Sequence, residues 1–193
     1  MKLSNSDIYT AIGKLSILKL LGKGKSGYSY LARHNGNHLV FKQMHNEPCS
    51  YYNFSGNKTR LEVESYNRLK ALGIPMPELL DYNFDQNYLV KEFIDGKTGS
   101  EIIAEDKVTD EQIGKLFRIY HILKNADMNI DYFPSNFILT KNDVYYIDYE
   151  SNHYLEEWDL VNWGIYYWAN PHGFKQFLAL GDAKHINQDL EKG

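Results

Sequence analysis

The sequence of 193 residues has few features that would cross-link the chain, anchor it in a membrane or attract nucleic acid. Its single cysteine, Cys49, excludes an intramolecular disulfide and a cysteine-based metal site. The longest apolar run, residues 160–169, is far shorter than the ~20 residues that span a bilayer, and the first residues are too polar for a signal peptide. Lys and Arg number 21 against 25 Asp and Glu, so the basic excess that binds nucleic-acid phosphates is missing. These absences predict a cytoplasmic protein with neither a membrane nor a nucleic acid as partner.

The composition is that of a soluble globular protein, with 43% hydrophobic and 24% charged residues. Strand patterns dominate the first half of the chain, and helical patterns dominate the second half. The pattern therefore predicts an α+β fold with an antiparallel sheet in the N-terminal half and a helix-rich C-terminal half.

In the first half, Asn35 and Gly36 are typical of a two-residue hairpin turn, because both positions of that turn favour positive φ. Ile8, Ile12 and Leu15 behind a Ser/Asp start predict a short helix over residues 6–14. A polar loop is expected over 45–58 and a helix over 59–72. The predicted strands are 16–21, 28–33, 38–44, 78–82 and 88–93.

In the second half, Thr109 with Gln112 three positions later forms a capping box, which predicts a helix that begins there. A short hairpin is expected over residues 137–140 and 144–148, and a further helix over 159–169.

A glycine-rich segment, residues 22–27, lies between the first two of these strands. Gly22, Gly24 and Gly27 would allow the backbone to approach phosphates closely, with Lys23 beside them. A strand follows the segment, whereas a dinucleotide-binding fold would place a helix there. The same arrangement covers the phosphates of ATP in protein kinases.

Lys42 lies near the end of the third predicted strand, 15 positions after Gly27. In kinases a lysine at this place holds the α- and β-phosphates and is oriented by a glutamate on a helix. Glu62 and Glu64 are the two candidates for that glutamate. Glu62 is preferred because Tyr66, at i+4, belongs to the apolar face of the helix.

The most informative block contains Asp131, Asn136 and Asp148. Asn136 follows Asp131 by five positions and Asp148 follows it by 17, which is the spacing of the catalytic and metal-binding loops of kinases. Phosphoryl transfer needs a carboxylate to orient the attacking hydroxyl and a metal ion to neutralise charge. Asp131 would orient the hydroxyl and accept its proton, while Asn136 and Asp148 would hold the metal.

With this ordered set in place, residues 18–168 resemble the protein-kinase-like superfamily. The resemblance implies a two-lobed fold with an N-lobe over 1–93, a hinge over 94–97 and a minimal C-lobe over 98–193. It also implies ATP as nucleotide and Mg²⁺ as metal, with Mn²⁺ as a substitute. The base of ATP would meet the Glu92 carbonyl and the Ile94 N–H.

Finer details of the resemblance lead in two directions. Asp148-Tyr149-Glu150 and Trp158-Asp159-Leu160 are similar to the aminoglycoside and choline kinase branch, in which Asp159 would brace the catalytic loop. Phe133 stands where serine/threonine kinases carry a lysine, and Asn129 replaces the usual histidine. The minimal C-lobe resembles RIO-type and tRNA-modification-associated atypical kinases, which act on or within larger partners.

The expected activity is transfer of the γ-phosphoryl of Mg-ATP to a hydroxyl, with a slight preference for an atypical minimal serine/threonine-type protein kinase. A small-molecule kinase remains the alternative, so the acceptor is either a protein or a small hydroxyl compound. A larger protein partner would supply the acceptor site in the first case. A non-catalytic, nucleotide-binding pseudokinase is the further alternative, since Phe133 and Asn129 depart from the usual pattern.

Overall fold

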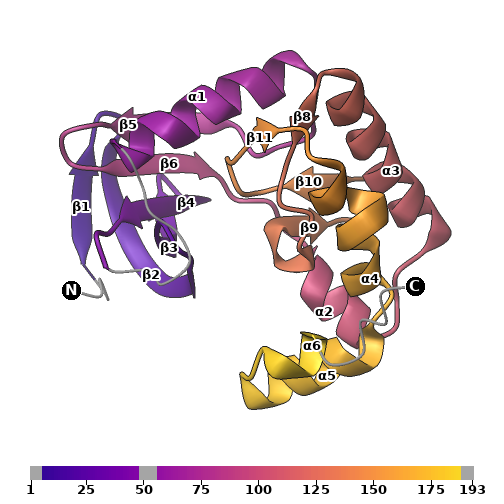
Figure 1. Cartoon of the computed structure of the whole chain (residues 1–193). Coiled ribbons are helices and arrows are strands. Elements are labelled where there is room, and N and C mark those ends of the chain that lie inside the picture. The colour runs from indigo at the N-terminus through magenta and orange to yellow at the C-terminus, as the bar shows by residue number, and fades with distance from the viewer. Residues whose placement is uncertain (1–5, 48–55, 188–193) are drawn as a thin grey trace. The chain divides into compact units, whose positions relative to one another are not determined.

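The computed structural model describes residues 6–47 and 56–187, in two compact units. Unit 1 comprises residues 1–67 and 77–93, and unit 2 comprises residues 68–76 and 94–193 (Figure 1). Cys49, the polar first residues and most of the loop predicted over 45–58 lie outside the described residues.

Unit 1 is built on a six-stranded antiparallel sheet with the strand order β1-β2-β3-β4-β6-β5 (Figure 1). The strands are β1 (Asp7–Thr10), β2 (Gly13–Lys23), β3 (Gly27–His34), β4 (Asn37–Met44), β5 (Leu79–Asn83) and β6 (Tyr88–Glu92). Alternate residues of the strands face a core that includes Leu15, Ile17, Tyr30, Phe41 and Val90. The β3–β4 turn is the predicted one, with φ of 48° at Asn35 and 85° at Gly36.

The helix predicted over residues 6–14 is wrong. This segment forms β1 and the start of β2, which pair with Ile8 opposite Leu15 and Thr10 opposite Gly13. Gly13 has a φ of 113°, which reverses the chain and cannot continue a helix. Ile8 and Ile12 still pack against the core, because a hairpin that folds back also brings residues four apart to one side.

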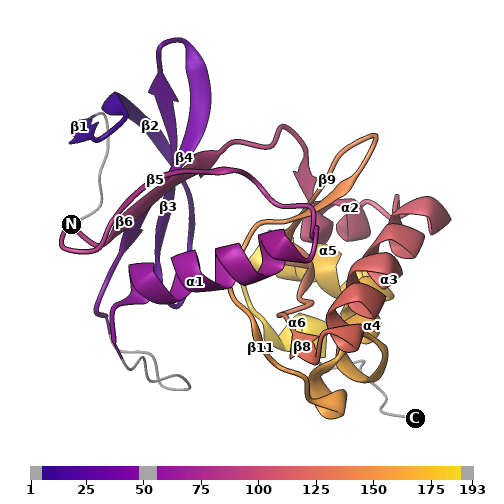
Figure 2. The same cartoon turned by 90° about the horizontal axis from the view of Figure 1, so that it is seen from above.

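Helix α1 (Lys58–Ala71) occupies the span of the predicted helix and runs beside the strands, as Figure 2 shows. Val63 and Tyr66 are buried on its inner face, and Lys58 is buried at its start. The Lys58 ammonium donates to the His45 carbonyl at 2.5 Å, which joins the helix to the segment after β4.

Unit 2 combines helices with two small sheets. Its helices are α2 (Gly99–Ala104), α3 (Asp110–Asn125), α4 (Ile165–Trp168), α5 (Pro171–Leu180) and α6 (Lys184–Asn187). The strands β7 (Lys97–Thr98), β9 (Phe137–Leu139) and β10 (Val144–Tyr146) form one sheet, and β8 (Met128–Asn129) pairs with β11 (Asn152–His153). Short 3-10 turns cover Pro134–Asn136 and Glu156–Trp158.

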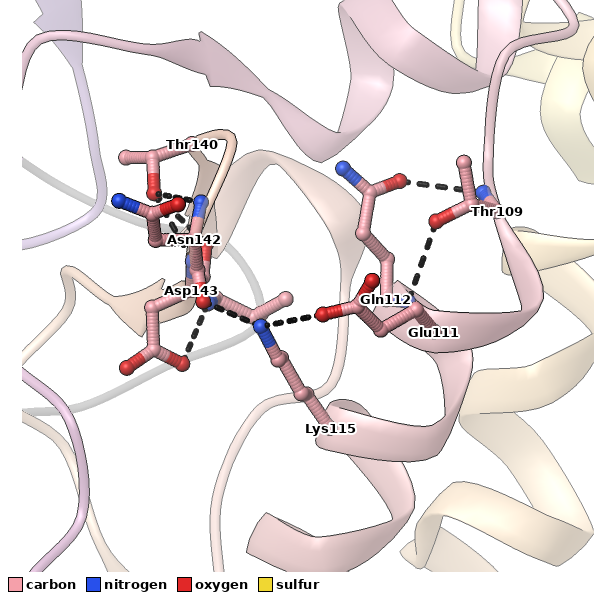
Figure 3. A network of polar contacts seen from close by, with 8 residues as sticks. Thr109, Glu111, Gln112, Lys115, Thr140, Asn142 and Asp143 are labelled. Atoms are coloured by element: carbon pink, nitrogen blue, oxygen red, sulfur yellow. Dashed lines mark hydrogen bonds and ion pairs between the residues drawn. The ribbon is translucent and has the colours of Figure 1, made fainter.

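Helix α3 fixes the β9–β10 hairpin (Figure 3). The predicted capping box is present, with the Gln112 N–H donating to Thr109 Oγ1 and the Thr109 N–H donating to Gln112 Oε1. One turn further on, Lys115 donates to the Asn142 carbonyl in the hairpin turn and pairs with Glu111 at 3.0 Å. The hairpin that follows the Asn136 turn and precedes Asp148 is therefore attached to a capped helix.

The helix predicted over 159–169 is present but begins irregularly. Residues Leu160–Gly164 form a π-helix, which α4 continues. At Gly164 an added Cβ would lie 2.6 Å from the Tyr132 Cβ, so glycine allows the close approach of the segment that carries Tyr132. Helix α5 was not predicted, although Asn170 as N-cap and Pro171 at the first helical position are a start signal.

The predicted fold class is confirmed: the structure is α+β, with an antiparallel sheet in unit 1 and a helix-rich unit 2, and is compatible with a two-lobed kinase-like fold. Within residues 6–47 and 56–187, the longest helix has 16 residues and none is long and apolar enough to cross a membrane.

Candidate functional site

The glycine-rich segment of unit 1 joins β2 to β3 in a tight loop. The Gly24 N–H donates to the Gly27 carbonyl at 2.9 Å, and the His45 N–H donates to the Ser26 carbonyl at 3.1 Å. A Cβ at Gly27 would lie 2.7 Å from the Gln43 carbonyl oxygen, whereas Gly22 has nothing within 4 Å of that position. Gly27 is thus required by packing, and Gly22 leaves open backbone that a ligand can approach.

Lys23 is engaged by a residue that the sequence did not single out. Its ammonium lies 2.5 Å from Glu47 Oε2, and the Tyr28 hydroxyl donates to Glu47 Oε1 at 2.5 Å. Hydrogen bonds from Lys23 and then from Tyr28 lower the pKa of Glu47 to about 2. Because Glu47 lies 24 positions after Lys23, no local pattern indicates the contact.

Lys42 lies in the middle of the sheet, with Ser29 of β3 and Leu89 of β6 as its cross-strand neighbours. Its ammonium is 2.6 Å from Glu62 Oε1, and both side chains are less than a tenth exposed. Glu64, the other candidate, is exposed. A buried pair of this kind gains little net stability from its charges, since both had to leave water.

The two residues expected to meet a base fall in different units. Glu92 ends β6, where its N–H donates to the Glu78 carbonyl at 2.9 Å. Ile94 is the first residue of the second segment of unit 2. Their contact with a nucleotide base stays a prediction.

Asp131, Asn136 and Asp148 are brought together in unit 2 by hydrogen bonds of the loop. Asp131 Oδ1 accepts the Phe133 N–H at 3.0 Å, and the Asn136 amide nitrogen donates to the Asp131 carbonyl at 3.2 Å. The Ile147 N–H donates to the Asn136 carbonyl at 2.8 Å, which brings the residue before Asp148 against the same turn. Because the Asn136 amide nitrogen is used within the loop, its amide oxygen is the atom left to serve as a ligand.

The buried Tyr146 lies within electrostatic reach of three carboxylates of this region. Burial, followed by the charges of Asp148, Asp131 and Glu150, raises the pKa of Tyr146 well above its ordinary value. The Tyr146 hydroxyl donates to the Glu150 carbonyl at 3.1 Å. Carboxylate and amide oxygens are ligands that suit Mg²⁺, which also keeps waters and phosphate oxygens as ligands. Among the described residues no cluster of three His, Cys, Asp or Glu side chains forms a complete metal cage.

Asp159 is fully buried and accepts hydrogen bonds from several donors. The Asn162 N–H donates to Oδ1 at 2.8 Å, while the hydroxyls of Tyr120 and Tyr154 donate to Oδ2 at 3.0 and 2.8 Å. Asn129, two positions before Asp131, donates from its amide nitrogen to the Trp158 carbonyl at 3.0 Å. Asp159 therefore holds α3 and the segment before the π-helix together, and sequence reasoning missed both tyrosines.

Phe133 belongs to an aromatic cluster. Its ring centroid lies 5.2 Å from that of Tyr167 and 5.7 Å from that of Phe174, which is fully buried on α5. Phe133 therefore has a packing role in this chain.

Comparison with known proteins gives a partial match. No protein-family model matches the chain. A probable bifunctional tRNA threonylcarbamoyladenosine biosynthesis protein from Methanocaldococcus jannaschii is 30% identical over 97 residues. The match covers 50% of this chain and 18% of that protein, so the chain is related to a small part of a much longer relative.

Proposed function

We propose that this chain is an ATP-dependent phosphotransferase. The observation that carries the proposal is the buried Lys42–Glu62 pair at 2.6 Å, beside a glycine-rich loop with open backbone at Gly22. A buried charged pair between a strand and a helix costs desolvation, so its charges add little net stability and a purely structural role explains it poorly. In kinases such a pair presents the lysine to the α- and β-phosphates of ATP.

We assign one task to each candidate residue of the two units. Lys42 binds the phosphates, and the loop over residues 22–27, with its open backbone at Gly22, covers them. Asn136 and Asp148 hold Mg²⁺, which when bound neutralises the phosphate charge. Asp131 accepts the proton of the attacking hydroxyl, whose oxygen bonds to the γ-phosphorus while the bond to the leaving ADP oxygen breaks.

The acceptor we propose is a hydroxyl on a protein. The relative takes part, by its name, in the biosynthesis of threonylcarbamoyladenosine in tRNA. This agrees with the resemblance of the reduced C-terminal half to atypical kinases associated with tRNA modification. Since such kinases act within larger partners, we propose that a partner protein supplies the acceptor and that the chain itself does not bind RNA.

Asp131→Asn tests the proposal. We expect it to lower phosphoryl transfer from labelled Mg-ATP by about 10²–10⁴-fold, because the proton acceptor is lost, while the Kd for Mg-ATP stays nearly unchanged. Asp127→Asn is the matched control, since Asp127 is an exposed turn residue four positions earlier with a φ of 55°, which asparagine also adopts.

Transfer is followed in parallel to proteins of a lysate and to a library of small hydroxyl compounds. Labelling of a compound alone would replace the protein acceptor with a small-molecule one. Unchanged transfer by Asp131→Asn would remove Asp131 from its role. Failure to bind Mg-ATP at millimolar concentration would overturn the phosphotransferase proposal.

A further inference from the structure

Glu62 accepts a second hydrogen bond besides that of Lys42. The Ser26 hydroxyl donates to Glu62 Oε1 at 2.9 Å, and Lys42 donates to the same oxygen at 2.6 Å. Ser26 is 8% exposed, Glu62 7% and Lys42 5%. Ser26 lies in the glycine-rich loop between Gly24 and Gly27, so its side chain joins that loop to α1.

The backbone of the loop is attached elsewhere. The Ser26 carbonyl accepts the His45 N–H, and the Gly24 carbonyl contacts His45 Nε2 at 3.1 Å. These contacts attach the loop to the segment after β4, the strand that carries Lys42. The Ser26 side chain adds a different partner, the carboxylate that orients the Lys42 ammonium.

We propose that Ser26 is a positioning residue that couples the glycine-rich loop to Lys42 through Glu62. The inference rests on the proposed function and identifies how the proposed phosphate-binding groups are positioned relative to one another. When Ser26 donates to Glu62, the loop N–H groups and the Lys42 ammonium are set relative to one carboxylate. A triphosphate then meets groups that are already positioned, which lowers the entropy cost of binding.

Removing the hydroxyl should uncouple the loop without breaking the ion pair. Lys42 has its own hydrogen bond to Glu62 Oε1, while Glu62 Oε2 is buried without a hydrogen-bond partner in the described structure. Ser26→Ala therefore leaves the Lys42–Glu62 pair in place. The substitution should weaken the binding of ligands that carry phosphates and should leave the recognition of the base unchanged.

The experiment measures the Kd of the full chain for Mg-ATP and for adenosine by calorimetry. We expect Ser26→Ala to weaken Mg-ATP about tenfold, the size of a hydrogen bond to a charged group, and to leave adenosine within about twofold. Ser26→Thr, which keeps the hydroxyl, should restore Mg-ATP affinity, whereas Ser26→Cys, a weak donor, should resemble Ser26→Ala.

Ser16→Ala is the matched control. Ser16 donates to the Asp7 carboxylate at 2.8 Å, and Asp7 is paired with Lys14 at 2.7 Å, so the chemistry is the same in an exposed place. We expect this variant to bind Mg-ATP as the wild type does.

A second readout needs no ligand. Amide hydrogen exchange at residues 22–27 should be faster in Ser26→Ala than in the wild type, because the loop has lost its attachment to α1. Exchange in Ser16→Ala should match the wild type in this loop. Unchanged exchange in Ser26→Ala would overturn the coupling.

The outcomes separate this inference from the proposed function. If the wild type binds no Mg-ATP, the proposed function fails and the role of Ser26 fails with it. If the wild type binds and Ser26→Ala binds equally well, only the Ser26 inference is overturned. Equal weakening of Mg-ATP and adenosine would assign Ser26 a general structural role and would also overturn it.

Discussion

Unit 1 contains the same three chemical groups twice, once in water and once in the interior. Ser16, Asp7 and Lys14 form an exposed set, with the Lys14 and Asp7 side chains 52% and 46% exposed. The buried set is Ser26, Glu62 and Lys42, in which the side chain of Lys42 is 7% exposed and that of Glu62 is 9% exposed. The serine and lysine bind different carboxylate oxygens in the exposed set and share one oxygen in the buried set.

The exposed set is local, because Asp7 and Ser16 are directly opposite in the β1–β2 hairpin. Water screens its charges, so it stabilises the hairpin little. The buried set joins a strand, a helix and a loop that are distant in sequence, and its charges are hardly screened. The difference teaches that similar distances at the two places have different consequences, and that only the buried set is suited to position a ligand.

Replacing the lysine of each set should give the largest difference in stability between the two sets. Lys42→Met leaves Glu62 buried and charged without its ion partner, so we expect the free energy of unfolding to fall by about 3–5 kcal/mol. Lys14→Met should leave the urea midpoint almost unchanged. The measurement is urea unfolding of both variants at pH 7.

A double variant separates stability from function in the buried set. Lys42→Met combined with Glu62→Leu removes both charges, which should recover most of the lost stability. We expect Mg-ATP not to raise the melting temperature of this double variant, because the lysine that we propose binds the phosphates is absent. Equal destabilisation by Lys42→Met and Lys14→Met would contradict the comparison.

The next effect concerns acid stability and contrasts Asp7 with the buried Asp159 of unit 2. Burial opposes the charge of Asp159, but donors from Asn162, Tyr154 and Tyr120 outweigh it, so its pKa lies below the ordinary 3.8. The ionised Asp159 therefore contributes stability that is fully present above pH 3.8, the ordinary pKa. This contribution is lost as the pH falls from 3.8 through the lower pKa that Asp159 has in the folded protein.

We expect Asp159→Asn to reduce this acid dependence at both low and high salt. The measurement is the unfolding midpoint between about pH 5 and pH 2, the range in which carboxyl groups titrate. The pKa of Asp7 is also lowered, chiefly by its hydrogen bonds from Lys14 and Ser16. Because the Asp7 and Lys14 side chains are exposed, salt weakens the charge–charge part of their pairing, so we expect the effect of Asp7→Asn to be smaller at high salt than at low salt. A salt-sensitive Asp159 effect would argue against its burial.

The smallest effect is expected at Glu47, which binds Lys23 beside the glycine-rich loop. Glu47→Gln releases Lys23 for phosphates, so we expect Mg-ATP to bind about twofold more tightly, a size typical of exposed ion pairs. Because the pKa of Glu47 is about 2, the ion pair persists at all pH values used for such assays. The measurement is the Kd by calorimetry, and weaker binding would show that Glu47 assists the loop.

Local signals in the sequence were sufficient for several elements. The Asn35-Gly36 turn and the Thr109 capping box appear in the structure as predicted, because each depends on residues within four positions. The preference for Glu62 over Glu64 came from helical periodicity, and the structure pairs Lys42 with Glu62. The Asp131–Asn136 bond likewise closes within one loop.

Contacts between distant residues were not predictable in the same way. Ser26 and Glu62 are 36 positions apart, and Tyr120 and Asp159 are 39 apart, so no periodicity relates them. The prediction of a helix over residues 6–14 failed for another reason. Residues four positions apart come together in a helix and also in a tight hairpin turn, so their spacing does not distinguish the two. The π-helix over Leu160–Gly164 has no signal in the local sequence, and the close approach of Tyr132 to Gly164 joins residues 32 positions apart, which only the packed structure reveals.

The cluster of Phe133 with Tyr167 and Phe174 has a practical consequence for protein engineering. A lysine at position 133 would influence its surroundings through its charge, whereas a phenylalanine acts only by touching its neighbours. The loop that carries Asp131 therefore depends on α5 being present and correctly packed. A shortened chain prepared for crystallisation or ligand screening should keep α5 through Leu180, and a label placed on its buried face would disturb a residue more than 40 positions earlier.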